Sequence, residues 1–247
     1  ESNMRILENH WLKNSNIAHR GLHDSEFPEN SMAAFKAGMA KGYPIEIDVH
    51  LTTDGKVVIF HDHETERVCG VKGEIEKMSY AETQELRLCG TDEKIPLLSE
   101  LLEIATTPIL CELKNLTRNI GPLESETYRI FKESGVDFAI QSFNPYSIIW
   151  YAENAPEVLR GQLSSFYDEQ KRCFQRYMLK AMLLNKKSKP DFISYDQANM
   201  PNKYVTKYCK KHVETARLAW TIRTQERIEE LSSFVDSFIF ELFIPVK

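Results

Sequence analysis

The chain has 247 residues, 42% of them hydrophobic, and its 31 lysines and arginines are outnumbered by 36 aspartates and glutamates, which gives a formal net charge of −5. This length provides one large core and is close to the size at which a (β/α)8 barrel closes. The negative balance excludes the global positive field with which nucleic-acid-binding proteins reach phosphates, so we expect no nucleic-acid partner.

No stretch approaches the roughly 18 to 20 uninterrupted apolar residues that span a bilayer, and the start of the sequence has no apolar signal-peptide core. We therefore expect a cytoplasmic protein without stable membrane association; a signal peptide removed before this start is the alternative. Residues 1–3, before Met4, are interpreted as an expression-tag remnant. The five cysteines contain no C-x-x-C pair, which predicts neither a disulfide framework nor a zinc knuckle. Cys111 is interpreted as a small buried hydrophobe.

Short runs rich in Ile, Val and Phe alternate with longer segments of helical period, a pattern typical of βα units around a parallel sheet. The predicted strands are Asn16 to His19, Pro44 to Leu51, Ile109 to Leu113, Asp137 to Ser142, Val158 to Leu163, Asp191 to Tyr195, Arg217 to Ile222 and Ser237 to Phe240. Eight strands with helical crossovers favour a (β/α)8 TIM barrel over a doubly wound sheet. Residues 4–247 are interpreted as a single domain.

Helices are expected between the strands. The first is predicted at Ser31 to Lys41, with Asn30 as its N-cap and Gly42 just past its end. Its Met32, Phe35 and Met39 have core-facing spacing. Another helix, Gln225 to Val235, precedes the final strand.

One segment breaks the alternation after the second strand. The turn Thr53-Asp54-Gly55 leads to a short strand, Val57 to Phe60, and then to a long excursion over residues 62–96. Its only predicted helix is Ser79 to Leu88. This apolar content is too small for an independent domain, so we interpret the excursion as an insertion in the barrel.

Acidic side chains alternate with apolar ones in the second strand. Glu46 and Asp48 fall on one face, which must be the barrel interior, and Glu112 and Lys114 repeat the pattern at the end of the next strand. Carboxylates this close need a cation, a proton or a basic partner. Three of them form an oxygen-rich site suited to one Mg²⁺ or Ca²⁺ ion rather than zinc; the alternative is neutralisation by Arg or Lys alone.

Two histidines end strands beside this group. His19 lies in His19-Arg20-Gly21 and His61 follows the short strand, so a pair of imidazoles flanking the site could serve as general base and general acid. Arg20 and Lys114 add positive charge, and Arg is well suited to bidentate binding of phosphate. Such a site predicts phosphodiester cleavage.

Several motifs occur here in a fixed order: His19-Arg20-Gly21, Pro28-Glu29-Asn30-Ser31, Glu46-Ile47-Asp48-Val49, Leu51-Thr52-Thr53-Asp54-Gly55, Val58, His61-Asp62, Ile95-Pro96-Leu97-Leu98 and Glu112-Leu113-Lys114. Together they resemble the glycerophosphodiester phosphodiesterase pattern. The resemblance is strong over residues 17–114 and continues more weakly through Gln141-Ser142-Phe143 and Trp220-Thr221 to the final strand.

The resemblance implies a barrel with a small insertion after the second strand and metal-dependent hydrolysis of glycerophosphodiesters to glycerol 3-phosphate and an alcohol. The roles that it implies agree with those reasoned from the residues: Glu46, Asp48 and Glu112 bind the metal, His19 and His61 are general base and acid, and Arg20 and Lys114 contact phosphate. Trp220 is either an apolar wall for the substrate or a core residue. The alternatives are a lysophospholipase D-like or cyclic-phosphate-forming lyase, and a catalytically silent protein that binds metal and phosphate.

Some features depart from the family pattern or are set aside. Arg223 stands where the family tends to have Asn, and the last strand, Phe238 to Phe243, is unusually apolar. Among the other histidines, His63 is expected to be solvated, and a surface position without a role is expected for His10, His23, His50 and His212. A basic amphipathic helix, Glu169 to Leu184, is expected to pack on the core rather than on lipid.

Overall fold

The structure is a computed structural model that describes residues 5–169 and 173–246. Its internal contacts divide the chain into two compact units, one of residues 18–138 and one that combines residues 1–17 with 139–247. The interpretation of residues 1–3 as a tag remnant lies outside the described residues.

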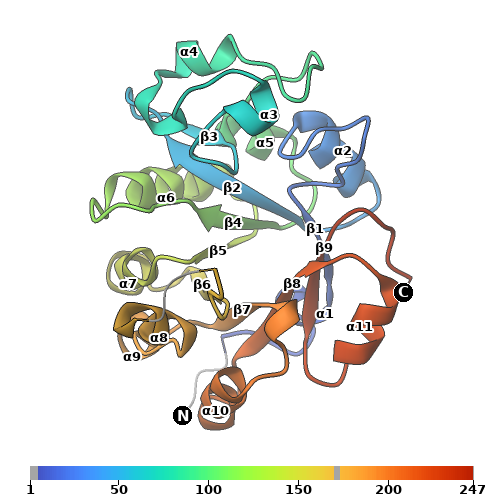
Figure 1. The fold of residues 1–247 in the computed structure, drawn as a ribbon, viewed down its shortest axis with the longest axis vertical. Coiled ribbons are helices and arrows are strands. Elements are labelled where there is room, and N and C mark those ends of the chain that lie inside the picture. The colour runs from blue at the N-terminus through green and yellow to red at the C-terminus, as the bar shows by residue number, and fades with distance from the viewer. Residues whose placement is uncertain (1–4, 170–172, 247) are drawn as a thin grey trace. The chain divides into compact units, whose positions relative to one another are not determined.

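The unit of residues 18–138 is organised around one long central strand (Figure 1). Strand β2 (Ile45–Leu51) pairs in parallel with β1 (Asn16–His19) and β4 (Ile109–Leu113), and antiparallel with β3 (Val57–Ile59). All but its last residue are buried, as expected of a strand covered on both faces. The helices of this unit are α2 (Met32–Ala40), α3 (Glu66–Cys69), α4 (Tyr80–Gln84), α5 (Leu98–Ile104) and α6 (Pro122–Ser134), with a 3₁₀ turn at Ile75–Lys77.

Helix α2 begins one residue later than the predicted cap implies. The N-cap is Ser31, whose hydroxyl accepts a hydrogen bond from the backbone N–H of Ala34 at 3.1 Å. The prediction that Asn30 caps this helix is wrong, because Asn30 has a left-handed backbone (φ 54°) and its side chain bonds elsewhere. Of the predicted core-facing positions, Phe35 and Met39 are buried, whereas Met32 is half-buried.

The insertion follows the hairpin of β2 and β3 (Figure 1). It has a small apolar core of its own, to which β3 and the residue after it contribute. The buried members of this cluster are Val58, Phe60, Val68, Ile75, Leu86, Leu88 and Ile95. Helix α4 starts where predicted, with a reciprocal capping box between Ser79 and Glu82, but it ends at Gln84 instead of Leu88. The insertion is therefore tied to β2 through a shared hairpin.

The second unit contains five parallel strands in sequence order. They are β5 (Phe138–Ser142), β6 (Leu159–Ser164), β7 (Phe192–Asp196), β8 (Ala216–Ile222) and β9 (Ser237–Phe240). Its helices are α1 (Trp11–Asn14), α7 (Pro145–Asn154), α8 (Phe174–Lys180), α9 (Asn185–Ser188), α10 (Lys203–Lys211) and α11 (Gln225–Leu231), with a 3₁₀ turn at Gln197–Asn199. Every predicted strand of both units is present, with ends that differ by at most one residue.

The basic segment before β7 folds differently from the prediction. Helix α8 covers only part of the predicted range Glu169 to Leu184, of which residues 170–172 lie outside the described residues. Its Phe174 is 73% exposed, whereas Met182, two residues after the helix, is buried. Cys111 is buried, which confirms its interpretation as a small hydrophobe. In the part of the chain that the structure describes, no helix combines the length and the apolar character needed to cross a bilayer.

Gly161 should not tolerate a side chain. It lies opposite Phe192 in the β6–β7 register, and a Cβ added to Gly161 would come within 2.0 Å of the buried Phe192 ring. We expect Gly161→Ala to lower the free energy of unfolding by about 1–3 kcal/mol, since overpacked cores relax only partly. Thermal unfolding would measure the loss. A Phe192→Leu background should reduce the additional cost of Gly161→Ala, and an equal cost in both backgrounds would contradict a clash with the ring.

Candidate active site

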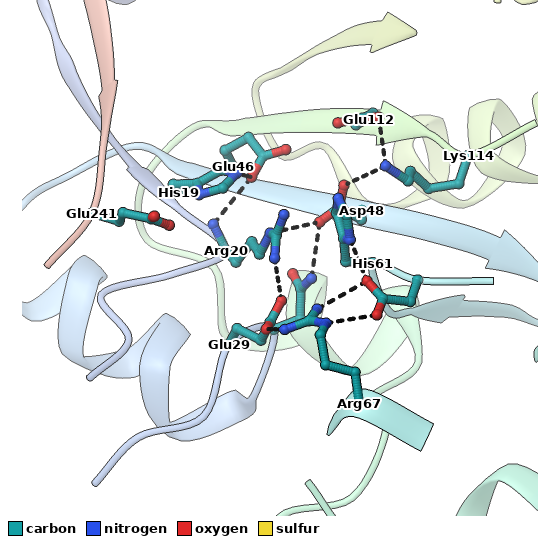
Figure 2. Close-up of polar contacts among 12 residues, drawn as sticks. His19, Arg20, Glu29, Glu46, Asp48, His61, Arg67, Glu112, Lys114 and Glu241 are labelled. Atoms are coloured by element: carbon teal, nitrogen blue, oxygen red, sulfur yellow. Dashed lines mark hydrogen bonds and ion pairs between the residues drawn. The ribbon is translucent and has the colours of Figure 1, made fainter. Parts of the chain in front are cut away.

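Three carboxylates meet at the carboxyl ends of β2 and β4. The parallel register sets Asp48 directly beside Glu112, and it sets Glu46 beside His19 of β1. Oxygens of Glu46, Asp48 and Glu112 all lie within 4.8 Å of one another, and each of the three residues is at most 7% exposed. The structure thus brings together the three residues predicted to bind a metal (Figure 2).

Two predicted phosphate ligands lie against these carboxylates. Lys114 Nζ donates to Glu112 Oε1 at 2.9 Å and lies 3.6 Å from Asp48 Oδ1. The Arg20 guanidinium bonds to Glu29 and its Nε lies 3.6 Å from Asp48 Oδ2, while its backbone N–H donates to Glu46 Oε2 at 3.0 Å. Basic partners are therefore present, as the alternative interpretation of the acidic strand requires.

These basic partners do not balance the acidic charge of the site. The polar network in Figure 2 that lies within residues 18–138 contains five carboxylates, Glu29, Glu46, Asp48, Asp62 and Glu112, and three permanent cations, Arg20, Arg67 and Lys114. With all five carboxyl groups ionised and the histidines neutral, its formal charge is −2. One divalent cation would neutralise it, which supports a metal in addition to the basic side chains.

The pKa values of the three carboxyl groups differ because their neighbours differ. Burial, together with Asp48 and Glu112, raises the pKa of Glu46 well above its usual range. Burial also raises the pKa of Glu112 to about 7, although Lys114 opposes the shift. At Asp48 burial is outweighed by Lys114, His61 and Arg20, so the pKa falls. Asp48 Oδ1 is nevertheless buried without a hydrogen-bond donor, an arrangement that suits a cation ligand.

The metal-free protein should lose stability as the pH rises. The pKa of Glu112 increases from 4.5 to about 7 on folding, so between these values the folded state holds more protons than the unfolded state and the free energy of unfolding falls. This group alone should account for about 3 kcal/mol at most. In EDTA, thermal unfolding at pH 5 and pH 8 should show a smaller decrease for Glu112→Gln than for the parent protein; an equal decrease would exclude Glu112 as its source.

The His61 imidazole is oriented by Asp62, which Arg67 in turn holds in place. Its Nδ1 lies 2.6 Å from Asp62 Oδ1, and Asp62 accepts two hydrogen bonds from Arg67, at 2.7 and 2.9 Å. Arg67 also bonds to Glu29, which links this chain of contacts to Arg20. Burial lowers the pKa of His61, although Asp48 opposes the shift, and this favours the neutral imidazole. His19 Nε2 lies 3.9 Å from Glu46 Oε2.

His50 supports the backbone of His61, and its expected surface position is wrong. The His50 side chain is fully buried, with Nδ1 at 2.9 Å from Glu76 Oε1 and Nε2 at 3.1 Å from the carbonyl oxygen of His61. His63 also bonds to Glu76, at 3.0 Å, instead of being only solvated. The alternation that identified Glu46 and Asp48 continues to His50, so the strand pattern contained a signal for it.

Other contributors were not assigned roles from the sequence. Asn30 donates to Asp48 Oδ2 at 3.0 Å, and Glu29, Asp62 and Arg67 form the chain of contacts behind His61. Glu29, Asn30 and Asp62 all belong to the motifs that carry the family resemblance, which is a signal for them. Arg67 lies in a charged run that gave none.

Trp220 and Arg223 belong to β8 and the residues after it. The Trp220 indole N–H donates to the Ser194 carbonyl at 3.1 Å, and its role as an apolar wall stays a prediction. The Arg223 guanidinium pairs with Glu241 at 2.7 and 2.9 Å. Glu241 follows the last strand, so Arg223, which departs from the family pattern, has an acidic partner at the end of β9.

Residues 19–239 match the family model of the glycerophosphoryl diester phosphodiesterase family. The chain belongs to this family. A glycerophosphodiester phosphodiesterase of Caldanaerobacter subterraneus is 32% identical over 62% of this chain and 67% of its own length. One from Bacillus altitudinis is 36% identical over 58% of this chain and 63% of its own. The chain thus spans about two thirds of the length of these two relatives.

Solved structures of phosphodiesterases share the fold. An Oleispira antarctica phosphodiesterase in complex with the product sn-glycerol-3-phosphate has a TM-score of 0.76 at 24% identity, over 92% of both chains. The Thermotoga maritima glycerophosphodiester phosphodiesterase has a TM-score of 0.72 at 21% identity, over 92% of this chain and 94% of its own. The fold class is the (β/α)8 TIM barrel, with β3 as an extra strand on β2 and a small insertion after it.

Proposed function

We propose that the protein hydrolyses glycerophosphodiesters to glycerol 3-phosphate and an alcohol. The observation that carries this proposal is the buried group of Glu46, Asp48 and Glu112. The network around it has a surplus charge of −2 and includes three basic side chains and two histidines. Family membership and the names of the two curated relatives support the same substrate class.

The carboxylates and the basic side chains have complementary tasks in this proposal. Glu46, Asp48 and Glu112 would hold one Mg²⁺ or Ca²⁺ ion, which when bound supplies Lewis-acid stabilisation of charge on the phosphoryl group. Lys114 and Arg20, which lie within 3.6 Å of Asp48 oxygens, would bind non-bridging phosphate oxygens. The product in the Oleispira antarctica structure carries such a phosphate.

The two histidines would move the protons. With its Nδ1–H directed to Asp62, His61 has Nε2 available for exchange. One imidazole removes a proton from the attacking hydroxyl while the other protonates the leaving alkoxide, so the P–O bond breaks without releasing a strong base. The attacking group is either water or the glycerol 2-hydroxyl, which would give a cyclic phosphate that water then opens.

The test is turnover of a panel of glycerophosphodiesters with Mg²⁺, with Ca²⁺ and with EDTA, with separate detection of glycerol 3-phosphate and of cyclic phosphate. We expect metal-dependent release of glycerol 3-phosphate. Cyclic phosphate as the final product would establish the lyase alternative, and lysophospholipid turnover without small diester turnover would favour a lysophospholipase D-like activity. A lack of turnover of every diester would overturn the proposal and favour a silent binding protein.

A further inference from the structure

A cavity of about 1080 Å³ lies within the unit that combines residues 1–17 and 139–247. It is bounded by α8, α9 and α10, which lie beside one another in Figure 1, and by residues at the amino ends of β6, β7 and β8. The carboxylates of the candidate active site lie on β2 and β4, so no residue is shared between the two places.

The cavity wall is strongly basic in a chain whose net charge is negative. Seven basic and two acidic side chains line it. Five are lysines from the region of α9 and α10: Lys186, Lys189, Lys203, Lys207 and Lys211. A concave surface of one sign focuses the potential and attracts ligands of the opposite charge. The wall therefore favours an anion.

Two arginines share one carboxylate at this wall. Arg160 is only 5% exposed, and its hydrogen bonds go to main-chain oxygens, the shortest to Ser188 at 2.9 Å. The nearby carboxylate, Asp191, pairs with Arg5 at 3.1 Å and accepts the backbone N–H of Arg160 at 3.0 Å. One buried positive charge is left without its own anion. Such a charge is costly unless a ligand compensates it.

An amide at the same wall is unsatisfied. Asn185 is 4% exposed, and neither its Nδ2 nor its Oδ1 has a hydrogen-bond partner among the described residues. Buried side-chain amides normally bond, so an unpaired one in a cavity wall indicates a missing partner. Tyr204, Tyr208 and Met182 add aromatic and apolar surface that suits an organic group.

We propose that this cavity binds the phosphate group of a small organic phosphate, with Arg160, Asn185 and the α10 lysines as ligands. A soluble phosphate ester and the headgroup of a phospholipid present the same chemistry to these side chains. The site does not depend on the proposed catalytic function, because none of its residues belongs to the candidate active site.

The proposal is tested by calorimetric titration with inorganic phosphate and with glycerol 3-phosphate. The titrations are done in EDTA and in a Lys114→Ala background, which weakens binding at the candidate active site. We expect saturable binding that falls at least tenfold in Arg160→Gln, Asn185→Leu and Lys207→Glu. Lys36→Glu, a charge reversal at an exposed position on α2, should leave it unchanged. If circular dichroism shows that Arg160→Gln does not fold, the test uses the other two variants, Lys207→Glu at an exposed position and Asn185→Leu.

A parallel sedimentation assay with phosphatidylglycerol vesicles separates the two sources of phosphate. If the protein binds vesicles but not the soluble phosphates, and if Lys207→Glu and Asn185→Leu abolish the vesicle binding, the ligand is a lipid headgroup. Absence of both kinds of binding, or binding that none of the three cavity variants changes, would overturn the proposal.

Discussion

Replacing His61 with alanine is expected to lower kcat for a glycerophosphodiester by about 10³-fold, and His19→Ala should have an effect of similar size. A positioned general acid or base contributes roughly 10²- to 10⁴-fold, and these two imidazoles are the ones beside the carboxylates. The measurement is steady-state hydrolysis at saturating metal.

The control for this pair is His10→Asn. His10 caps α1 through its Nδ1, and asparagine can provide the same cap, so this variant changes a histidine without disturbing the candidate site. Each catalytic variant should also retain the thermal midpoint and the metal affinity of the parent protein. Activity within tenfold of the parent in His61→Ala would exclude it as an essential acid or base.

Removing the metal, or a ligand for it, is expected to have the other large effect. EDTA should reduce diester hydrolysis to background. Free metal at about 100 times its Kd should stabilise the folded state by about 2.7 kcal/mol, because it binds only the folded protein. Asp48→Asn should abolish this stabilisation, since Asp48 provides a buried carboxylate oxygen that accepts no hydrogen bond.

Glu126→Gln is the matched control for the ligand variant. Glu126 pairs with Arg129 on the surface of α6, outside the carboxylate group, so its variant should bind metal and respond to EDTA as the parent does. If Asp48→Asn kept the full metal-dependent increase in the thermal midpoint, the assignment of these carboxylates as the metal site would be wrong.

The strands were predictable because the hydrophobic pattern that identifies each one lies within its own segment of the sequence. In β2 and β4 almost every residue is buried, so each strand is a short apolar run, and the polar interruptions Glu46, Asp48 and Glu112 stand out from it. Alternation then assigns these side chains to one face. The structure then shows the parallel register, which places Asp48 beside Glu112.

What the sequence did not predict depends on contacts between distant residues. Arg67 and Glu29 are 38 positions apart, and nothing in either segment indicates that they bond. The left-handed backbone of Asn30 moved the cap to Ser31, because the Asn30 side chain bonds to Asp48. Helix α8 is shorter than predicted, because hydrophobic periodicity indicates which face of a helix is apolar but not where the helix begins and ends.

The hairpin of β2 and β3 also limits how this protein can change in length during evolution. Residues 52–56 form a tight, hydrogen-bonded turn, and His61 is reached only five residues after it. Deleting one residue between Val57 and His61 would move the imidazole to the opposite face of the ribbon. Insertions and deletions should therefore be tolerated at the exposed residues after α3, Val71 and Lys72, and be nearly absent from this ribbon, whose length fixes the position of His61.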